Sequence, residues 1–308
     1  MRQDLTIAPR VVDALELGRP VVALESTLIT HGLPYPDNVE TALAMEAAVR
    51  EGGAEPATIA VLKGQITVGL TGDEIETLGR APAGSVRKIS RRDLSISVGL
   101  REDGATTVAG TMIVAARAGI RVFATGGIGG VHRGHPFDIS ADLIELGRTP
   151  VAVVCSGAKS ILDLPATVEV IETHGVPVIG YTTDTLPAFY SRSSNLPVTV
   201  RVDTPQQAAA IIAAAFRLAL GHGLLIGVPV PEADAMPDAD AEAAIRQATA
   251  DADAAGILGR DVTPYVLARV AGSTAGQSRR ANTSLLVNNA RTAALIAVAL
   301  TDHSELRP

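Results

Sequence analysis

The stretch VAVVCSGAKS, residues 151–160, carries the pattern on which the rest of the chain is built. An apolar run typical of a buried strand is followed at once by small and polar residues, Ser156-Gly157-Ala158-Lys159. A strand that is apolar on both faces indicates a mostly parallel sheet covered by helices on both sides. In such sheets the residues just beyond the carboxyl end of a strand line the ligand site. Lys159 therefore stands where chemistry is expected.

The same pattern occurs twice more. The apolar run 20–24 is followed by Glu25-Ser26-Thr27, and the run 121–124 is followed by TGGIGGVHR at 125–133. Because the carboxyl ends of parallel strands meet at one edge of a sheet, we expect these three segments to converge.

Outside these segments, apolar runs alternate with helical patterns. A hairpin at Lys63-Gly64-Gln65 makes the expected sheet mixed, and no clear linker or repeat interrupts the chain. We therefore expect a single α/β domain over residues 1–308, with a mixed, mostly parallel central sheet and helices on both faces. Further strands are expected at 58–62, 66–70, 86–89, 94–98, 176–181 and 223–230, and helices at 39–50, 107–118, 140–146, 205–220, 239–255, 264–270 and 283–300.

Composition narrows the class of protein. Hydrophobic residues make up 47% of the 308 residues and aromatic residues only 3%, so Ala, Val, Leu and Ile must build the core. A net charge of −7 without a Lys/Arg-rich run argues against general nucleic-acid binding. No unbroken apolar run approaches about 18 residues, so no membrane span is expected. The single cysteine, Cys155, fits a reducing compartment, and we expect a cytoplasmic protein.

Lysine is rare in this chain. Only Lys63, Lys88 and Lys159 stand against 23 arginines. A guanidinium stays protonated in proteins, whereas an ε-amine can lose its proton and act as a nucleophile. Burial, and the N-terminus of a helix expected directly after Lys159, would favour its neutral amine. The alternative is a lysine that extends its amine from a helix start into solvent.

Glu25 and the glycine-rich turn offer further chemistry. A carboxyl group in an apolar pocket can act as a general acid, although Glu25 could instead cap a turn or face water. The turn does not fit a dinucleotide-binding motif, because the register that starts at Gly127 places His132 where the third glycine belongs. Its glycines would instead let the backbone approach a phosphate or sugar. His132 and Arg133 would supply donors. His135 could be a metal ligand or a further loop residue, and we favour the loop interpretation.

Asp138, Ser140 and Asp142 occupy alternate positions in FDISADL. Such oxygen ligands suit a hard cation that keeps several waters, as Mg²⁺ and Mn²⁺ do. The alternative is that Asp138 or Ser140 caps a helix.

Lys88 and Asn289 are two further candidate binding residues. Lys88 belongs to the basic stretch RKISRRD at 87–93, which is either a phosphate clamp or a solvated strand end with salt bridges. Asn289, on the last predicted helix, could hydrogen-bond a ligand.

Together these segments resemble the pseudouridine-5′-phosphate glycosidase family, also called indigoidine synthase A-like. The resemblance runs in family order over residues 8–300. It is carried by VALEST (22–27), RKISRRDL (87–94), GATTVA (104–109), FATGGIGGVHRG (123–134), FDISADL (137–143) and GAKSILDL (157–164).

The resemblance implies reversible cleavage of the C–C glycosidic bond of pseudouridine 5′-phosphate to uracil and ribose 5-phosphate, assisted by Mn²⁺, in a homotrimer. It assigns Lys159 as the nucleophile that holds the opened ribose as an imine, and Glu25 as the proton donor. Asp138 matches the metal ligand. The positions that match substrate contacts or walls of the site are Lys88, Val108, His132, Ser140, Ala141, Asp142 and Asn289.

A nucleophilic Lys159 and an acidic Glu25 suit that chemistry. The paired carboxylates of ordinary glycosidases act on a leaving-group oxygen, and a C–C glycosidic bond has none. Two departures from the family pattern are a shorter stretch at His135-Pro136 and Gly110 in place of a common serine. Two alternatives stay open: another imine-forming lyase or aldolase that acts on a sugar phosphate, or a non-catalytic protein that binds one. Release of uracil from pseudouridine 5′-phosphate would distinguish the glycosidase from these alternatives.

Overall fold

The computed structural model describes residues 5–257, 259 and 262–303. The strands are β1 Leu5–Ile7, β2 Val21–Leu24, β3 Glu55–Leu62, β4 Gln65–Val68, β5 Arg87–Ile89, β6 Gly104–Thr106, β7 Val122–Ala124, β8 Val131–His132, β9 His135–Ile139, β10 Ala152–Cys155, β11 Leu162–Asp163, β12 Val178–Tyr181, β13 Val200–Val202 and β14 Leu224–Gly227. The α-helices are α1 Pro9–Glu16, α2 Thr27–His31, α3 Asp37–Glu51, α4 Gly72–Gly79, α5 Arg91–Leu100, α6 Val108–Ala118, α7 Ala141–Leu146, α8 Leu164–Thr173, α9 Pro205–Leu218, α10 Asp238–Ala254, α11 Val262–Ser273 and α12 Gln277–Leu300, and a 3₁₀ turn covers Glu232–Asp234.

One large sheet runs through the molecule in the order β1-β4-β3-β2-β7-β10-β14-β12-β13, and β6 and β5 branch from β3. Among the described strands of this sheet, only the pairs β3–β4 and β3–β6 are antiparallel. The predicted mixed, mostly parallel α/β fold is therefore confirmed. The hairpin between β3 and β4 turns at Lys63 and Gly64, which both have positive φ.

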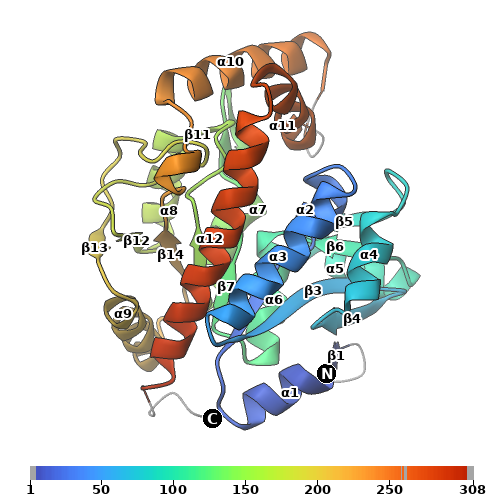
Figure 1. Cartoon of the computed structure of the whole chain (residues 1–308), viewed down its shortest axis with the longest axis vertical. Coiled ribbons are helices and arrows are strands. Elements are labelled where there is room, and N and C mark those ends of the chain that lie inside the picture. The colour runs from blue at the N-terminus through green and yellow to red at the C-terminus, as the bar shows by residue number, and fades with distance from the viewer. Residues whose placement is uncertain (1–4, 258, 260–261, 304–308) are drawn as a thin grey trace.

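Burial explains the composition of the central strands. All four residues of β10 are buried, and Ala152 is paired with Val122 on one side and Leu224 on the other. In Figure 1, α12 runs along one face of the sheet with α3 beside it, while α6 and α7 lie behind the sheet. Small alanines on these helices let them lie close to the strands, as a core with 3% aromatic residues requires.

Helix α12 is the most apolar long element of the described chain. By length and composition it could cross a membrane, which the sequence analysis did not anticipate. However, 61% of its most apolar window is buried inside the protein. It packs against α3, α9 and the strands β2, β7 and β10, so its apolar character is explained by its place in the core.

Three local predictions were wrong. His135, interpreted as a loop residue, is the first residue of the strand β9. Residues 94–98 belong to helix α5 and not to a strand, because Ser90 and Asp93 form a capping box and Leu94 and Ser97 form one buried helical face. The helix expected directly after Lys159 begins only at Leu164, since the strand β11 intervenes. A helix N-terminus therefore does not abut the Lys159 amine.

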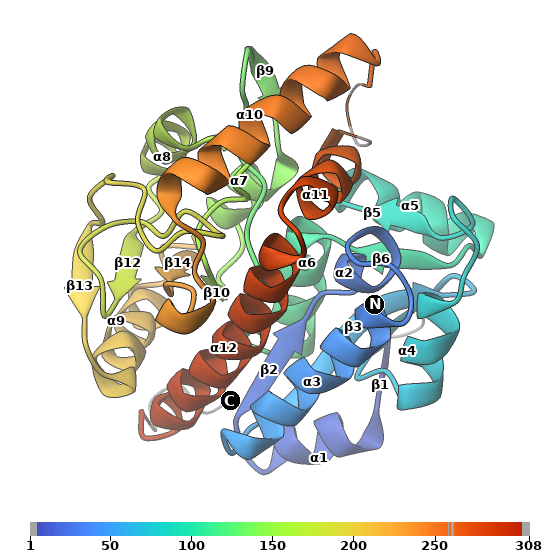
Figure 2. The same cartoon turned by 45° about the horizontal axis from the view of Figure 1, so that its top comes forward.

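A small second sheet lies at one end of the molecule. It joins β11, β8 and β9 in antiparallel order. Figure 2 shows α10 extending across this same end, beside β9 and above α11. The buried residues of α10 are Ala241, Ile245, Ala248 and Ala252, a helical stripe that joins the main core.

Candidate active site

Three turns meet at the carboxyl edge of the central sheet. They follow β2, β7 and β10, which are adjacent and parallel. The turns are also bonded to each other: Thr125 N donates to Val154 O at 3.0 Å, and Ser156 N donates to Gly126 O at 2.9 Å. The sheet therefore places the segments that contain Glu25, Thr125 and Lys159 on one rim.

The Glu25 side chain is 5% exposed, as its position after a buried strand suggested. Its carboxyl group does not lie in an apolar pocket, however. One oxygen accepts a hydrogen bond from the Thr27 hydroxyl and the other from the Thr125 hydroxyl. These two bonds fix the plane of the carboxyl group, so that Glu25 has a defined orientation at the rim.

Asn289 on α12 lies directly beneath this rim and is fully buried. Its amide nitrogen donates to Thr125 O at 2.9 Å and lies 3.2 Å from Ser156 Oγ. The side chain thus joins the turns after β7 and β10 to the helix that covers them. Its predicted contact with a substrate stays a prediction, while its contact with the rim is direct.

Lys159 is half-buried and its backbone is held on both sides. Its N–H donates to Ile128 O at 3.0 Å, and its carbonyl accepts from Leu162 N at 3.0 Å. Gly157, with φ +84°, lies so close to Pro187 that a Cβ would come within 2.0 Å of the Pro187 carbonyl oxygen. A glycine is therefore required at the turn that leads to Lys159.

The FDISADL segment has a structural role at α7. Ser140 is the N-cap of α7 and accepts from Asp142 N, as one of the two interpretations required. The buried Asp142 carboxylate accepts from Ala109 N at 2.9 Å and from Gly129 N at 2.8 Å. Asp142 thereby joins the glycine-rich turn to the first turn of α6, which begins at the buried Val108. Ala141, the first residue of α7, is exposed.

Electrostatics bring four further predicted residues together around His132. Burial is the main cause that lowers the pKa of His132, and the nearby positive charges of His135, Lys88 and Lys159 lower it further. The Asp138 carboxylate acts in the opposite direction. Charges influence one another in this way only over short distances, so these residues share one neighbourhood.

The basic stretch at 87–93 is divided between two roles. Arg87 forms two hydrogen bonds with Glu102, and Arg91 forms two with the buried Glu145 on α7. These arginines therefore support the structure, as the salt-bridge interpretation required. Lys88 is half-buried, and its charge reaches His132.

The turn after β7 is rich in glycine for a different reason from the predicted approach of a phosphate or sugar. A Cβ at Gly127 would come within 2.7 Å of the Phe189 ring, one at Gly129 within 2.2 Å of Ser140 Oγ, and one at Gly130 within 2.4 Å of Thr167 Oγ1. The protein's own side chains occupy the space beside these positions. The turn is thus glycine-rich because it is tightly packed against its neighbours.

A cavity of about 80 Å³ opens beside His132, between the small sheet and the α10–α11 pair. The small sheet contributes His132, His135 and Asp138, and the α10–α11 pair contributes Thr249 and Asp253. Neither Thr249 nor Asp253 was predicted as a site residue. Both lie in the helix expected at 239–255, and the helical periodicity of that stretch offers no signal for a site.

The donor set beside this cavity suits at most a weakly held hard cation. Within the described residues, no cluster of three or more His, Cys, Asp or Glu side chains could enclose a metal ion. The Asp138 side chain is exposed on β9 beside His132. A single carboxylate of this kind is compatible with Mg²⁺ or Mn²⁺, which keep several of their waters and bind through one or two carboxylates.

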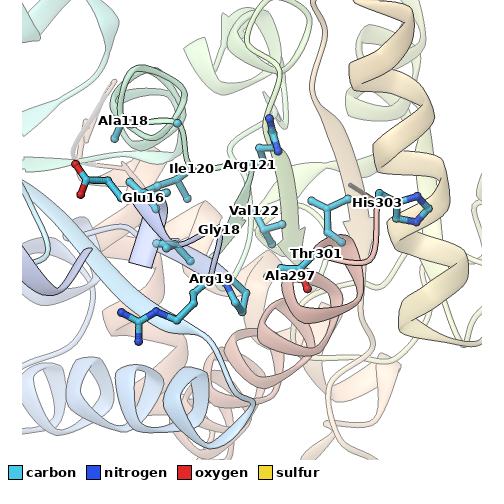
Figure 3. Close-up of a pocket in the computed structure, with 15 residues that line it drawn as sticks. Glu16, Gly18, Arg19, Ala118, Ile120, Arg121, Val122, Ala297, Thr301 and His303 are labelled. Atoms are coloured by element: carbon cyan, nitrogen blue, oxygen red, sulfur yellow. The ribbon is translucent and has the colours of Figure 1, made fainter. Parts of the chain in front are cut away.

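A larger cavity lies at the opposite edge of the sheet. It measures about 500 Å³ and is shown in Figure 3. Val122 at the start of β7 and Gly18, Arg19 and Ile120 in the preceding loops line it, and none of the predicted site residues does. Since ligands of parallel sheets bind beyond the carboxyl ends of the strands, this cavity lies at the wrong edge for the predicted site. The smaller cavity is lined by the predicted residues His132 and Asp138, but neither Glu25 nor Lys159 lines it.

Comparison with known proteins finds relatives that match nearly the whole chain. Residues 10–299 match the model of a protein family described as indigoidine synthase A like protein. A pseudouridine-5′-phosphate glycosidase from Herpetosiphon aurantiacus is 58% identical over 96% of this chain and 98% of its own length. The protein of the same name from Escherichia coli is 54% identical over 95% of this chain and 94% of its own length.

Two solved structures share the fold. The prealnumycin C-glycosynthase AlnA, solved in complex with ribulose 5-phosphate, superposes with a TM-score of 0.90 at 43% identity, covering 98% of this chain and 99% of its own. An indigoidine synthase A-like protein from Thermotoga maritima gives a TM-score of 0.88 at 33% identity, covering 96% of each chain.

Proposed function

The chain belongs to the indigoidine synthase A-like family, and on this premise we propose that it is an enzyme that cleaves pseudouridine 5′-phosphate to uracil and ribose 5-phosphate. The observation that supports this most is the shared rim, where the Glu25 segment follows β2 and the Lys159 segment follows β10, the two parallel strands that flank β7. The names of relatives 54% and 58% identical to the chain point to the same reaction. The ribulose 5-phosphate bound to a structural neighbour supports a phosphorylated pentose as ligand.

In the proposed mechanism, Lys159 is the nucleophile and Glu25 is the proton donor. The neutral Lys159 amine bonds to C1 of the ribose while the bond from C1 to the ring oxygen breaks, and that oxygen takes up the proton that the attacking nitrogen gives up. Glu25 then protonates the uracil carbon as the C–C bond breaks, and the nitrogen lone pair forms the C=N bond of an imine. Water hydrolyses the imine, which releases ribose 5-phosphate and restores the amine.

The remaining predicted residues are proposed to bind and orient the substrate. Lys88 would contact the phosphate or ribose as a compact charge, and His132, which is neutral near pH 7 because of its lowered pKa, would hydrogen-bond the ligand. Asp138 would be the protein ligand of a Mn²⁺ ion, which would supply positive charge beside an anionic substrate. The homotrimer and the cytoplasmic location implied by the family likewise remain part of this proposal.

A trapping experiment tests the proposal. The protein is incubated with pseudouridine 5′-phosphate, uracil is quantified, and borohydride is added so that an imine becomes a stable amine located by peptide mass mapping. We expect uracil release and an adduct on Lys159. The variant Lys159→Arg should lose most turnover, because a guanidinium is not a nucleophile at this pH. Lys63→Arg, on the exposed hairpin tip, is the matched control and should behave like the wild type.

The outcomes separate the alternatives. An adduct without uracil release would indicate a different imine-forming lyase or aldolase. Ligand binding with neither adduct nor uracil would indicate a non-catalytic sugar-phosphate-binding protein. An adduct on a residue other than Lys159 would refute the assignment of the nucleophile.

A further inference from the structure

Arg133 lies at the junction of two parts of the active site. It directly follows β8, and its guanidinium contacts both the loop after Lys159 and the helix α10. Toward the loop, Nη2 donates to Ser160 O and Nε donates to Leu162 O, both at 3.1 Å. The planar guanidinium therefore holds the carbonyl groups of two residues that follow Lys159 within three positions in the sequence.

The other side of the same guanidinium is paired with Glu242 on α10. Nη1 donates to Glu242 Oε1 at 2.6 Å and Nη2 donates to Oε2 at 3.0 Å. This two-point geometry fixes the orientation of both groups and suits arginine, since a lysine amine lacks the planar fork of donors. The hydrogen bonds from Arg133 also lower the pKa of Glu242, so that its carboxylate is charged at neutral pH.

The loop has little other support from its own side chains. The Ser160 hydroxyl is buried, and within the described part of the chain it has no hydrogen-bond partner. The Thr249 hydroxyl on α10, which lines the cavity, is likewise buried without a partner among the described residues. Buried hydroxyls without partners are costly, so each of the two is suited to bind a water or a polar ligand group.

We propose that Arg133 is a positioning residue that couples the α10–α11 pair to the Lys159 loop through its pairing with Glu242. The inference rests on the proposed function for its kinetic consequence, but not for the coupling itself. Glu242 orients the guanidinium, and the guanidinium orients the two loop carbonyls. Without the Glu242 carboxylate the guanidinium loses its second anchor, and the loop becomes less ordered.

The test compares two neutralised carboxylates on α10. Glu242→Gln removes the charge that orients Arg133. Asp251→Asn is the matched control, because Asp251 accepts two hydrogen bonds from Arg269 on α11 and does not contact the Lys159 loop. Arg133→Lys keeps the positive charge at 133 but cannot make the fork of bonds.

With pseudouridine 5′-phosphate we expect kcat to fall about fivefold in Glu242→Gln, with KM changed less than about twofold, since the pair is partly exposed. Arg133→Lys should fall at least as far, and Asp251→Asn should stay within about twofold of the wild type. Raising the salt concentration from about 0.05 to 0.5 M should slow the wild type toward the Glu242→Gln rate by screening the pair. The rate of Glu242→Gln should change little.

Hydrogen exchange tests the coupling without catalysis. In Glu242→Gln the amides of residues 159–163 should exchange about fivefold faster, including that of Leu162, which donates to Lys159 O. In Asp251→Asn they should not. If the loop exchanges equally in both variants, the coupling is refuted. If the wild type releases no uracil but the exchange responds as expected, the proposed function fails and the coupling stands.

Discussion

Asn289 offers a sharp test of how the rim is held. Replacing it by alanine removes the amide that bonds Thr125 O at 2.9 Å and contacts Ser156 Oγ at 3.2 Å. Thr125 and Ser156 are themselves fully buried, so neither the carbonyl nor the hydroxyl can turn to water. An unsatisfied buried polar group costs about 1–3 kcal/mol, and the two together predict a loss of about 3 kcal/mol.

The assay is urea denaturation, with Asn288→Ala as the matched control. Asn288 is half-buried, and its amide nitrogen lies 3.5 Å from Pro229 O, the limit of a hydrogen bond, so its loss should cost less than about 1 kcal/mol. With a slope of about 3 kcal/mol per M of urea, the Asn289→Ala midpoint should fall by about 1 M. Turnover should also fall, because Thr125 orients Glu25. Equal losses in the two variants would refute the reasoning.

Three further outcomes are expected. Asp138→Asn should lower the pKa of His132 further, because the carboxylate is the nearby charge that raises it; an NMR titration showing a rise would contradict this. Burial raises the pKa of the Cys155 thiol to about 12, so thiol reagents at pH 8 should modify it only on unfolding, and rapid native labelling would count against it. Gly129→Ala should displace Ser140, whose Oγ would lie 2.2 Å from the new Cβ; circular dichroism melting should show the loss, and an unchanged melting temperature would contradict it.

Much of the fold could be predicted from local patterns in the sequence. Apolar runs followed by small and polar residues placed β2, β7 and β10, and their shared edge followed from the rules of parallel sheets. The same periodicity misassigned residues 94–98, since a short apolar run suits a strand or a helix face equally well. The capping box at Ser90 and Asp93 decided for the helix.

The hydrogen-bond partners of the site residues could not be predicted from local sequence patterns. Glu25 bonds Thr125, which lies 100 residues away in the sequence, and Arg133 bonds Glu242, which lies 109 residues away. Such pairs depend on which strands become neighbours and on how far a helix extends, and both are set by packing of the whole chain. The pocket around Glu25 was therefore predicted to be apolar and is lined by hydroxyl groups.

The sequence by itself determined the alternation of strands and helices, the single buried cysteine and the scarcity of lysine that drew attention to Lys159. These are properties of residue type and spacing, which act within a few residues along the chain. Only the tertiary structure decided that Asn289 lies beneath the rim and that α10 lines the small cavity beside His132. The physical reason is that burial and hydrogen-bond partners are set across the sheet, where distance along the chain carries no information.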